Sequence, residues 1–188
     1  MVAIPQKLTP EEYLELEAQS STKHEYINGE IYAMAGTTDT HNTICGNVYM
    51  LMRNHLRGTD CRVYFADVKV RVESKNCFYY PDVLVTCNPE DRQTNTYKSF
   101  PKLIIEVLSE STEAFDRGNK FNDYQSLDSL EEYVLLNNQQ QRVEIFRRNA
   151  DSTWQFLTYT PQQETCILQS IELQLKFSEI YEDVEFES

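Results

Sequence analysis

The chain of 188 residues lacks the segments that mark membrane and secreted proteins. It has no run of about 18 apolar residues, the length that suggests a membrane-spanning helix. Its first residues, MVAIPQKLTPEEY, contain neither a basic leader nor an apolar signal segment. We therefore expect a soluble, cytoplasmic protein that does not associate with a membrane.

Cysteine is scarce, odd in number and irregularly spaced. The five cysteines are Cys45, Cys61, Cys77, Cys87 and Cys166. No CxxC pair is present, which argues against a zinc site or a redox motif, and an odd number of widely spaced thiols argues against a disulfide framework. We expect all five to be ordinary reduced thiols.

Positive charge is also in short supply. The chain has 17 Lys and Arg against 30 Asp and Glu, a net charge of −13, which repels polyanions such as nucleic acids. Acidic residues gather in segments 11–17 and 179–188. Basic residues cluster elsewhere, at Lys69, Arg71 and Lys75 and at Arg142, Arg147 and Arg148. A local positive surface therefore remains compatible with the sequence.

The remaining composition is that of a folded globular protein. Hydrophobic residues make up 40% of the chain and aromatic residues 12%, enough for a substantial core. The length predicts one domain spanning residues 1–188.

The amino-terminal third contains clear helix and turn signals. Thr9 and Glu12 form a capping-box pattern around Pro10, which predicts a helix extending to about Ala18. Asn28-Gly29 stands between two half-apolar runs and predicts a tight type I′ hairpin. Residues 40–56 have helical spacing of apolar residues, and Gly58 is a suitable end point.

The middle of the chain reads as strands rich in apolar residues. In CRVYFADVKVRVE the alternation changes phase near Asp67, which predicts a bulge or bend. Asp67 is either a bulge residue bonded to its own backbone, which we favour, or an acid on the substrate side. The runs YYPDVLVTC and KLIIEVLS are almost continuously apolar, as in a sheet covered on both faces.

The carboxyl-terminal half completes an α/β fold of the mixed α+β type. A helical pattern over 111–127 followed by the strand EEYVLLN predicts a crossover unit. QRVEIFRR, TWQFLTYT and IELQLK are typical of an antiparallel series, and FSEIYEDVEF of a closing helix capped by Ser178. We expect one central mixed β-sheet flanked by helices, with an amino-terminal helix and β-hairpin.

Two carboxylates interrupt the apolar strands. Asp82 lies within YYPDVLVTC and Glu106 within LIIEVL, and burying both in ionised form is costly unless a cation is near. Lys120 is a candidate cation, because Asp116, Lys120 and Tyr124 are spaced by four and share one helical face. Either acid alone could equally belong to a structural ion pair, and Asp116–Lys120 could be a solvated surface pair.

These segments together resemble the PD-(D/E)XK nuclease superfamily, and more closely its Uma family of restriction-endonuclease-like proteins. The resemblance runs from about Thr9 to Ile180 and is carried by HEYINGEIYAMAG, the helix bearing His41, YYPDVLV, IIEVLSEST, DRGNKFNDY and EEYVLLN. It implies a restriction-endonuclease-like fold in which Pro81-Asp82 is the PD element and Glu106 the second acid. The superfamily's usual lysine would fall on Leu108, so the resemblance passes that role to Lys120 on the helix.

The resemblance implies a metal-dependent endonuclease. Asp82, Glu106 and the backbone carbonyl of Val107 would hold Mg²⁺ or Mn²⁺, because hard cations prefer oxygen ligands. Lys120 would orient the attacking water and offset charge on the phosphate. Glu25 resembles an additional acid contributed by an early element. His41 would contact a phosphate or shuttle a proton, or is simply a polar residue at a helix start.

The expected partner is nucleic acid, most directly DNA, and restriction-type nucleases of this kind commonly act as homodimers. The alternative is a catalytically inactive nucleic-acid-binding or regulatory protein that retains the nuclease fold. The net charge and Leu108 favour this alternative, whereas the acid pair with Lys120 favours the enzyme.

Overall fold

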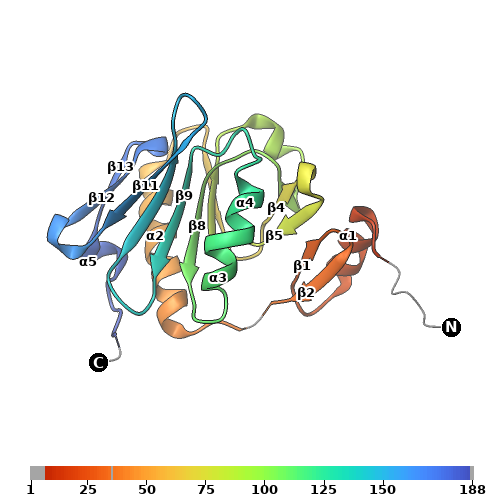
Figure 1. The fold of residues 1–188 in the computed structure, drawn as a ribbon, viewed down its shortest axis with the longest axis horizontal. Helices are drawn as coiled ribbons and strands as arrows, with labels where there is room; N and C mark the ends of the chain where they lie inside the picture. The colour runs from red at the N-terminus through yellow and green to blue at the C-terminus, as the bar shows by residue number, and fades with distance from the viewer. Residues whose placement is uncertain (1–6, 35, 187–188) are drawn as a thin grey trace.

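The computed structural model describes residues 7–34 and 36–186, which form three β-sheets with helices packed on them (Figure 1). The helices are α1 (Pro10–Gln19), α2 (Asp39–His55), α3 (Glu113–Phe115), the π-helical η3 (Asp116–Lys120), α4 (Phe121–Tyr124) and α5 (Phe177–Ile180). Short 3₁₀ turns are η1 (Glu73–Lys75), η2 (Pro89–Arg92), η4 (Pro161–Gln163) and η5 (Gln169–Ile171). The strands are β1 (His24–Ile27), β2 (Glu30–Ala33), β3 (Arg62–Phe65), β4 (Lys69–Val72), β5 (Cys77–Tyr79), β6 (Val83–Thr86), β7 (Tyr97–Lys98), β8 (Pro101–Leu108), β9 (Glu132–Asn137), β10 (Val143–Arg148), β11 (Trp154–Tyr159), β12 (Thr165–Leu168) and β13 (Leu173–Lys176).

The largest sheet has six strands in the order β11-β10-β9-β8-β6-β3. Strands β8 and β9 are parallel and are joined through α3, η3 and α4, which confirms the predicted crossover unit. Helix α2 packs on one face, where Ile44 and Val48 join the core of Val83 and Ile105. The α3–α4 helix covers the other face, so the central strands are buried on both sides, as their apolar sequences predict.

The second sheet, in the order β2-β1-β5-β4-β7, carries the amino-terminal elements. The capping box of Thr9 and Glu12 is present, and the β1–β2 hairpin turns at Asn28 and Gly29 with φ angles of 52° and 94°. Both positive angles are those of a type I′ turn, which confirms the predicted hairpin. Tyr13 of α1 stacks on Tyr26 with ring centroids 5.1 Å apart, and this contact attaches the helix to the sheet.

The expected central mixed sheet is present, but it is not the single sheet of the fold, because the chain alternates repeatedly between the two larger sheets from β3 to β8. Between β3 and β4, Ala66 has a φ of 64°, and the two strands belong to different sheets instead of forming one bulged strand. Asp67 is exposed at this crossing, and its carboxylate pairs with Lys23 rather than with its own backbone. A further crossing, between β5 and β6, contains Asp82, which is therefore at a junction and not in mid-strand.

The carboxyl-terminal predictions also need correction. IELQLK does not extend the series of β10 and β11; β13 pairs instead with β12 in a separate two-stranded sheet. Helix α5 has Lys176 at its N-cap, so Ser178 lies inside the helix and does not cap it. Lys176 and Glu179 supply the capping contacts, so the helix begins two residues earlier than a cap at Ser178 would give.

The prediction of five reduced cysteines is wrong for one pair. Cys61 and Cys87 form a disulfide, while Cys45, Cys77 and Cys166 are free and buried. The antiparallel pairing of Arg62 with Thr86 places the two flanking cysteines opposite each other. This pairing depends on strand register, and a separation of 26 residues along the chain gives no sign of it.

None of the helices in residues 7–34 and 36–186 is long and apolar enough to cross a membrane.

We predict opposite effects on stability for two glycine substitutions. Gly29→Ala should lower the free energy of unfolding by about 1 to 3 kcal/mol, because Gly29 has a positive φ and a new Cβ would meet the Lys7 Cβ at 2.6 Å. Gly46→Ala, inside α2 with nothing within 4 Å of the new methyl group, should raise it by about 0.5 to 1 kcal/mol. Urea unfolding of both variants checks the pair, and equal effects would contradict the hairpin geometry.

Candidate functional site

The β5–β6 crossing between the sheets places Asp82 beside Glu106. The Asp82 backbone N–H donates to Glu106 Oε2 at 3.3 Å, and the Val107 N–H donates to Asp82 Oδ2 at 2.7 Å. These bonds connect the β5–β6 junction to the neighbouring strand β8. About a quarter of the Asp82 side chain, 24%, is exposed, whereas Glu106 is buried. The two acids therefore lie side by side, with Glu106 buried and Asp82 partly in contact with solvent.

Lys120 is the buried cation of this region. Its Nζ lies 3.0 Å from Glu106 Oε1, 3.1 Å from Glu25 Oε1 and 3.5 Å from Asp116 Oδ1. The side chain is 6% exposed, so Lys120 is not the solvated surface lysine that its helical position also allowed. The structure thus brings together Glu25 from the hairpin, Glu106 from β8 and Lys120 from the helix.

The local shape of the crossover helix contributes to this contact. Asp116–Lys120 is π-helical, a rare geometry that is frequent at functional sites. The Tyr133 hydroxyl donates to the Asp116 carbonyl at 3.0 Å and fixes the segment against β9. Tyr124 follows on the same face, and its hydroxyl donates to Glu106 Oε1 at 3.5 Å. The helix therefore presents both a cation and a neutral donor to Glu106.

The electrostatics of this cluster are dominated by burial and by acids in excess. Burial raises the pKa of Glu106 well above its ordinary value, although the charge of Lys120 opposes the shift. Burial likewise raises the pKa of Asp116. For Lys120, burial lowers the pKa, but the negative charges of Glu106, Glu25 and Asp116 outweigh it and leave the pKa well above normal. Lys120 is therefore a permanent cation.

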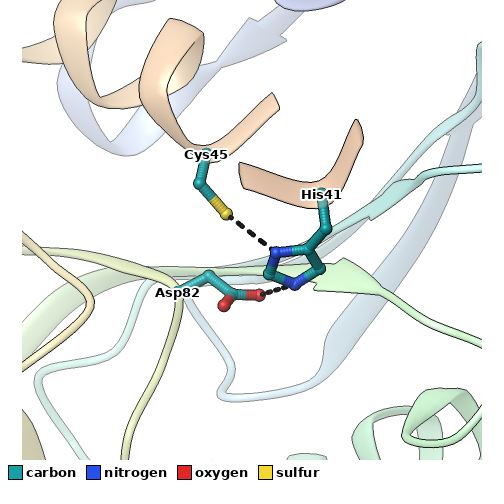
Figure 2. Close-up of side chains that lie close together, drawn as sticks. All are labelled: His41, Cys45 and Asp82. Atoms are coloured by element: carbon teal, nitrogen blue, oxygen red, sulfur yellow. Dashed lines mark hydrogen bonds and ion pairs between the residues drawn. The ribbon is translucent and has the colours of Figure 1, made fainter. Parts of the chain in front are cut away.

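His41 faces Asp82 from the first turn of α2 (Figure 2). Its Nε2 lies 3.2 Å from Asp82 Oδ2. Burial lowers the pKa of His41, but the hydrogen bond and charge of Asp82, with a backbone hydrogen bond to Val107, raise it overall. The histidine is thus held next to the carboxylate and is protonated at a higher pH than a free imidazole.

Cys45 and Asp116 belong to the same region although the sequence did not single them out as site residues. Cys45 Sγ lies 3.6 Å from His41 Nδ1, one helical turn further along α2 (Figure 2). The i, i+4 spacing of His41 and Cys45 was the available signal. Asp116 was considered a surface partner of Lys120, but its side chain is buried. A buried partner cannot be told from a surface one until the packing of the helix is known.

Two sets of metal-ligand groups share Asp82. The first is the set that the sequence predicts, Asp82, Glu106 and the Val107 carbonyl, whose oxygen atoms would suit hard cations such as Mg²⁺ or Mn²⁺. The second is His41, Cys45 and Asp82, whose ligand atoms lie within 4.8 Å of one another. Nitrogen and sulfur ligands suit a softer ion such as Zn²⁺. The buried thiol has a raised pKa, which disfavours the thiolate that such an ion needs.

The chain is similar to two cyanobacterial proteins and to one solved structure. It is 38% identical over 180 residues to the uncharacterized protein slr1290 of Synechocystis sp., covering 96% of this chain and 94% of that protein. It is 32% identical over 156 residues to the uncharacterized protein sll1609 of the same organism, covering 82% and 88%.

The solved structure is that of a "putative nuclease belonging to DUF820" from Anabaena variabilis. It superposes with a TM-score of 0.75 at 16% identity and covers 93% of this chain and 97% of its own. This likeness confirms the expected restriction-endonuclease-like fold. A family model, Uma2, described as "Putative restriction endonuclease", matches residues 10–178, most of the chain. The protein therefore belongs to the Uma2 family, as its sequence motifs predict.

Proposed function

We propose that this protein is a Mg²⁺- or Mn²⁺-dependent endonuclease that hydrolyses phosphodiester bonds of nucleic acid, most directly DNA. The family and the nuclease fold support a nuclease-like function. The observation that carries the proposal is the buried Lys120, held by carboxylates next to the partly exposed Asp82. A buried cation with several acids is costly to maintain as a purely structural feature, so its link through Glu106 to the partly exposed Asp82 favours chemistry.

The residues fit a hard divalent cation. Three carboxyl groups, those of Glu25, Glu106 and Asp116, surround Lys120. The backbone N–H of Asp82 donates to Glu106, and the Asp82 carboxylate faces His41, the second basic group. This excess of acid is the charge that a divalent cation would balance. Asp82, Glu106 and the Val107 carbonyl would hold the ion. When bound, it would polarise a phosphodiester oxygen and increase the acidity of a bound water.

The chain's own residues would position the substrate and compensate charge. Lys120 stays protonated, so it acts as an electrostatic and orienting group and not as a base. Glu25 and Asp116 fix its Nζ from two sides. His41 holds a proton against Asp82 and is suited to contact a phosphate or to shuttle a proton at the solvent side.

Leu108 explains why the lysine comes from the helix. This residue occupies the position of the superfamily's usual lysine, yet it is buried among Phe121, Tyr124 and other apolar side chains beneath the helix. A charged group at position 108 would have to displace that packing. Lys120 reaches Glu106 from the helix above the same face of β8. The cation is thus supplied to the same acid by a different element.

A second candidate function is a catalytically inactive nucleic-acid-binding or regulatory protein with this fold. The net charge of −13 is the observation that favours it, because the overall field opposes the approach of a polyanion. Bound metal would reduce that field only locally. The cleavage experiment below separates the two functions.

We predict metal-dependent cleavage that requires the three central residues. Purified protein should cleave labelled duplex DNA, single-stranded DNA or RNA with Mg²⁺ or Mn²⁺. Asp82→Ala and Glu106→Ala should abolish cleavage, and Lys120→Ala should lower kcat by about 10²- to 10³-fold, as expected for loss of an electrostatic stabiliser. Lys176→Ala, a change at an exposed lysine paired with Glu179, is the matched control and should leave the rate unchanged. Cleavage that survives Asp82→Ala indicates a contaminant, and an inactive wild type favours the binding protein.

We also predict that the ion stabilises the fold through the oxygen ligands. Mg²⁺ or Mn²⁺ at about 100 times its Kd should add about 2.7 kcal/mol to the free energy of unfolding, seen as a higher Tm. Asp82→Ala should remove the gain, and Cys45→Ser should retain it because a thiol is a poor ligand for these ions. A gain that disappears in Cys45→Ser would instead assign the ion to the set of His41, Cys45 and Asp82.

We expect a homodimer, since two active sites are needed to cut both strands of a duplex. Light scattering during size-exclusion chromatography should give twice the chain mass of 22.1 kDa. A species of single-chain mass at all working concentrations would refute the dimer.

A further inference from the structure

A pocket of about 580 Å³ lies directly beside the candidate site. Its lining comes from the β1–β2 hairpin, from β5, from the α3–α4 helix and from the loop that precedes it. The lining includes Glu25, Tyr32, Tyr79, Phe115, Asn119 and Asn122. The volume is within the range of about 300 to 1,000 Å³ that is typical of small-ligand sites.

The chemistry of this pocket suits a flat, neutral ligand with hydrogen-bonding edges. Tyr32, Tyr79 and Phe115 provide aromatic surface, and Asn119 and Asn122 provide exposed amides that both donate and accept hydrogen bonds. Among the lining residues in the described part of the chain there is no Lys or Arg, whereas Glu25 and Asp123 are acidic. An anionic phosphate is therefore disfavoured inside it. Nucleobases combine a planar face with polar edges and are bound by such residues.

We propose that this pocket receives one unstacked nucleobase of the bound strand, adjacent to the phosphate held at the candidate site. The proposal rests on the proposed nuclease function, whose substrate it specifies. Asn119 and Asn122 would contact the edge of the base, and Tyr32 would stack on its face.

The pocket is continuous with the catalytic residues. Glu25 belongs to both, because its Oε1 contacts Lys120 Nζ and its side chain lines the pocket. The Tyr79 ring also links them: Lys120 Nζ lies 5.7 Å from its centroid. The Tyr79 hydroxyl donates to Asp123 Oδ2 at 2.6 Å, which fixes the ring as a rigid wall. A base in the pocket is thus held next to the position of the scissile phosphate.

Tyr32 forms the solvent-exposed side of the pocket. It is 49% exposed on β2, where its hydroxyl donates to Glu30, and so leaves an aromatic face in contact with solvent. This exposed aromatic face at the edge of the pocket is available to stack on a base. Because a base must leave its stack to enter, the pocket favours single strands or weakly paired positions over intact duplex.

The test measures coupling between one base and the pocket without requiring turnover. Wild-type protein is titrated with a fluorescein-labelled single strand in Ca²⁺, which also takes oxygen ligands, and with strands in which one base at a time is removed. Fluorescence anisotropy should show about tenfold weaker binding for one abasic position and little change at the others. In Tyr32→Ala and in Asn119→Ala the full strand should bind more weakly, and the same abasic position should then have no further effect.

Matched variants test whether the Tyr32 ring and the pocket lining cause this coupling. Tyr32→Phe should keep the coupling because the ring remains, and Asn95→Ala, at an exposed asparagine outside the pocket lining, should behave as wild type. Equal losses at every abasic position, or an unchanged loss in Tyr32→Ala, would overturn the pocket proposal while the cleavage assay judges the activity separately. Tight binding of a free nucleoside that fails to compete with the strand would assign the pocket to a small effector and would also overturn it. Failure to bind any strand would overturn it as well.

Discussion

The ion cluster of Lys120 with Glu25, Glu106 and Asp116 is the interaction on which the rest of the site depends. A buried lysine and a buried glutamate are each costly alone, and removing either partner leaves the other uncompensated. The partners come from three elements: the hairpin, the central strand β8 and the crossover helix. The cluster therefore fixes the helix against the six-stranded sheet and brings the hairpin of the second sheet to the same point.

The crossing between β5 and β6 gives the two acids their different environments. There the chain passes from one sheet to the other, so Asp82 lies outside both strands with its side chain partly in solvent. Glu106 stays inside the paired strand β8, where burial is nearly complete. Asp82 is therefore in contact with solvent, whereas Glu106 is held by Lys120 and Tyr124. In the proposed metal site, Asp82 would meet the ion from the solvent side and Glu106 from the buried side.

Much of the fold was predictable because its signals are local. The capping box at Thr9, the Asn28-Gly29 turn and the crossover helix depend on residues within a few positions of one another. The assignment of strands to sheets depends on distant pairing, and it failed at Ala66 and at the β12–β13 pair. The Cys61–Cys87 disulfide was not predicted for the same reason, since it is the register of β3 on β6 that brings these two residues together.

The candidate site shows the same division between local and distant information. Asp82, Glu106 and Lys120 were found because a charged residue in an apolar segment, or on the helical face that follows, is visible in the sequence. Asp116 and Cys45 were not singled out, because a surface salt bridge and a core thiol have the same sequence signature as a site residue.

The position of Lys120 on a helix also determines what lies beside the site. A lysine at position 108 would approach from β8 itself and would require no helix above the acids. With Leu108 in that place, the crossover helix must pack closely over β8 to deliver its cation, and its next turn carries Asn122 and Asp123 toward the hairpin. The pocket is formed between this helix and the hairpin that supplies Glu25. The same packing that compensates for the missing strand lysine therefore creates a recess next to the acids, which connects the catalytic and recognition proposals through one structural cause.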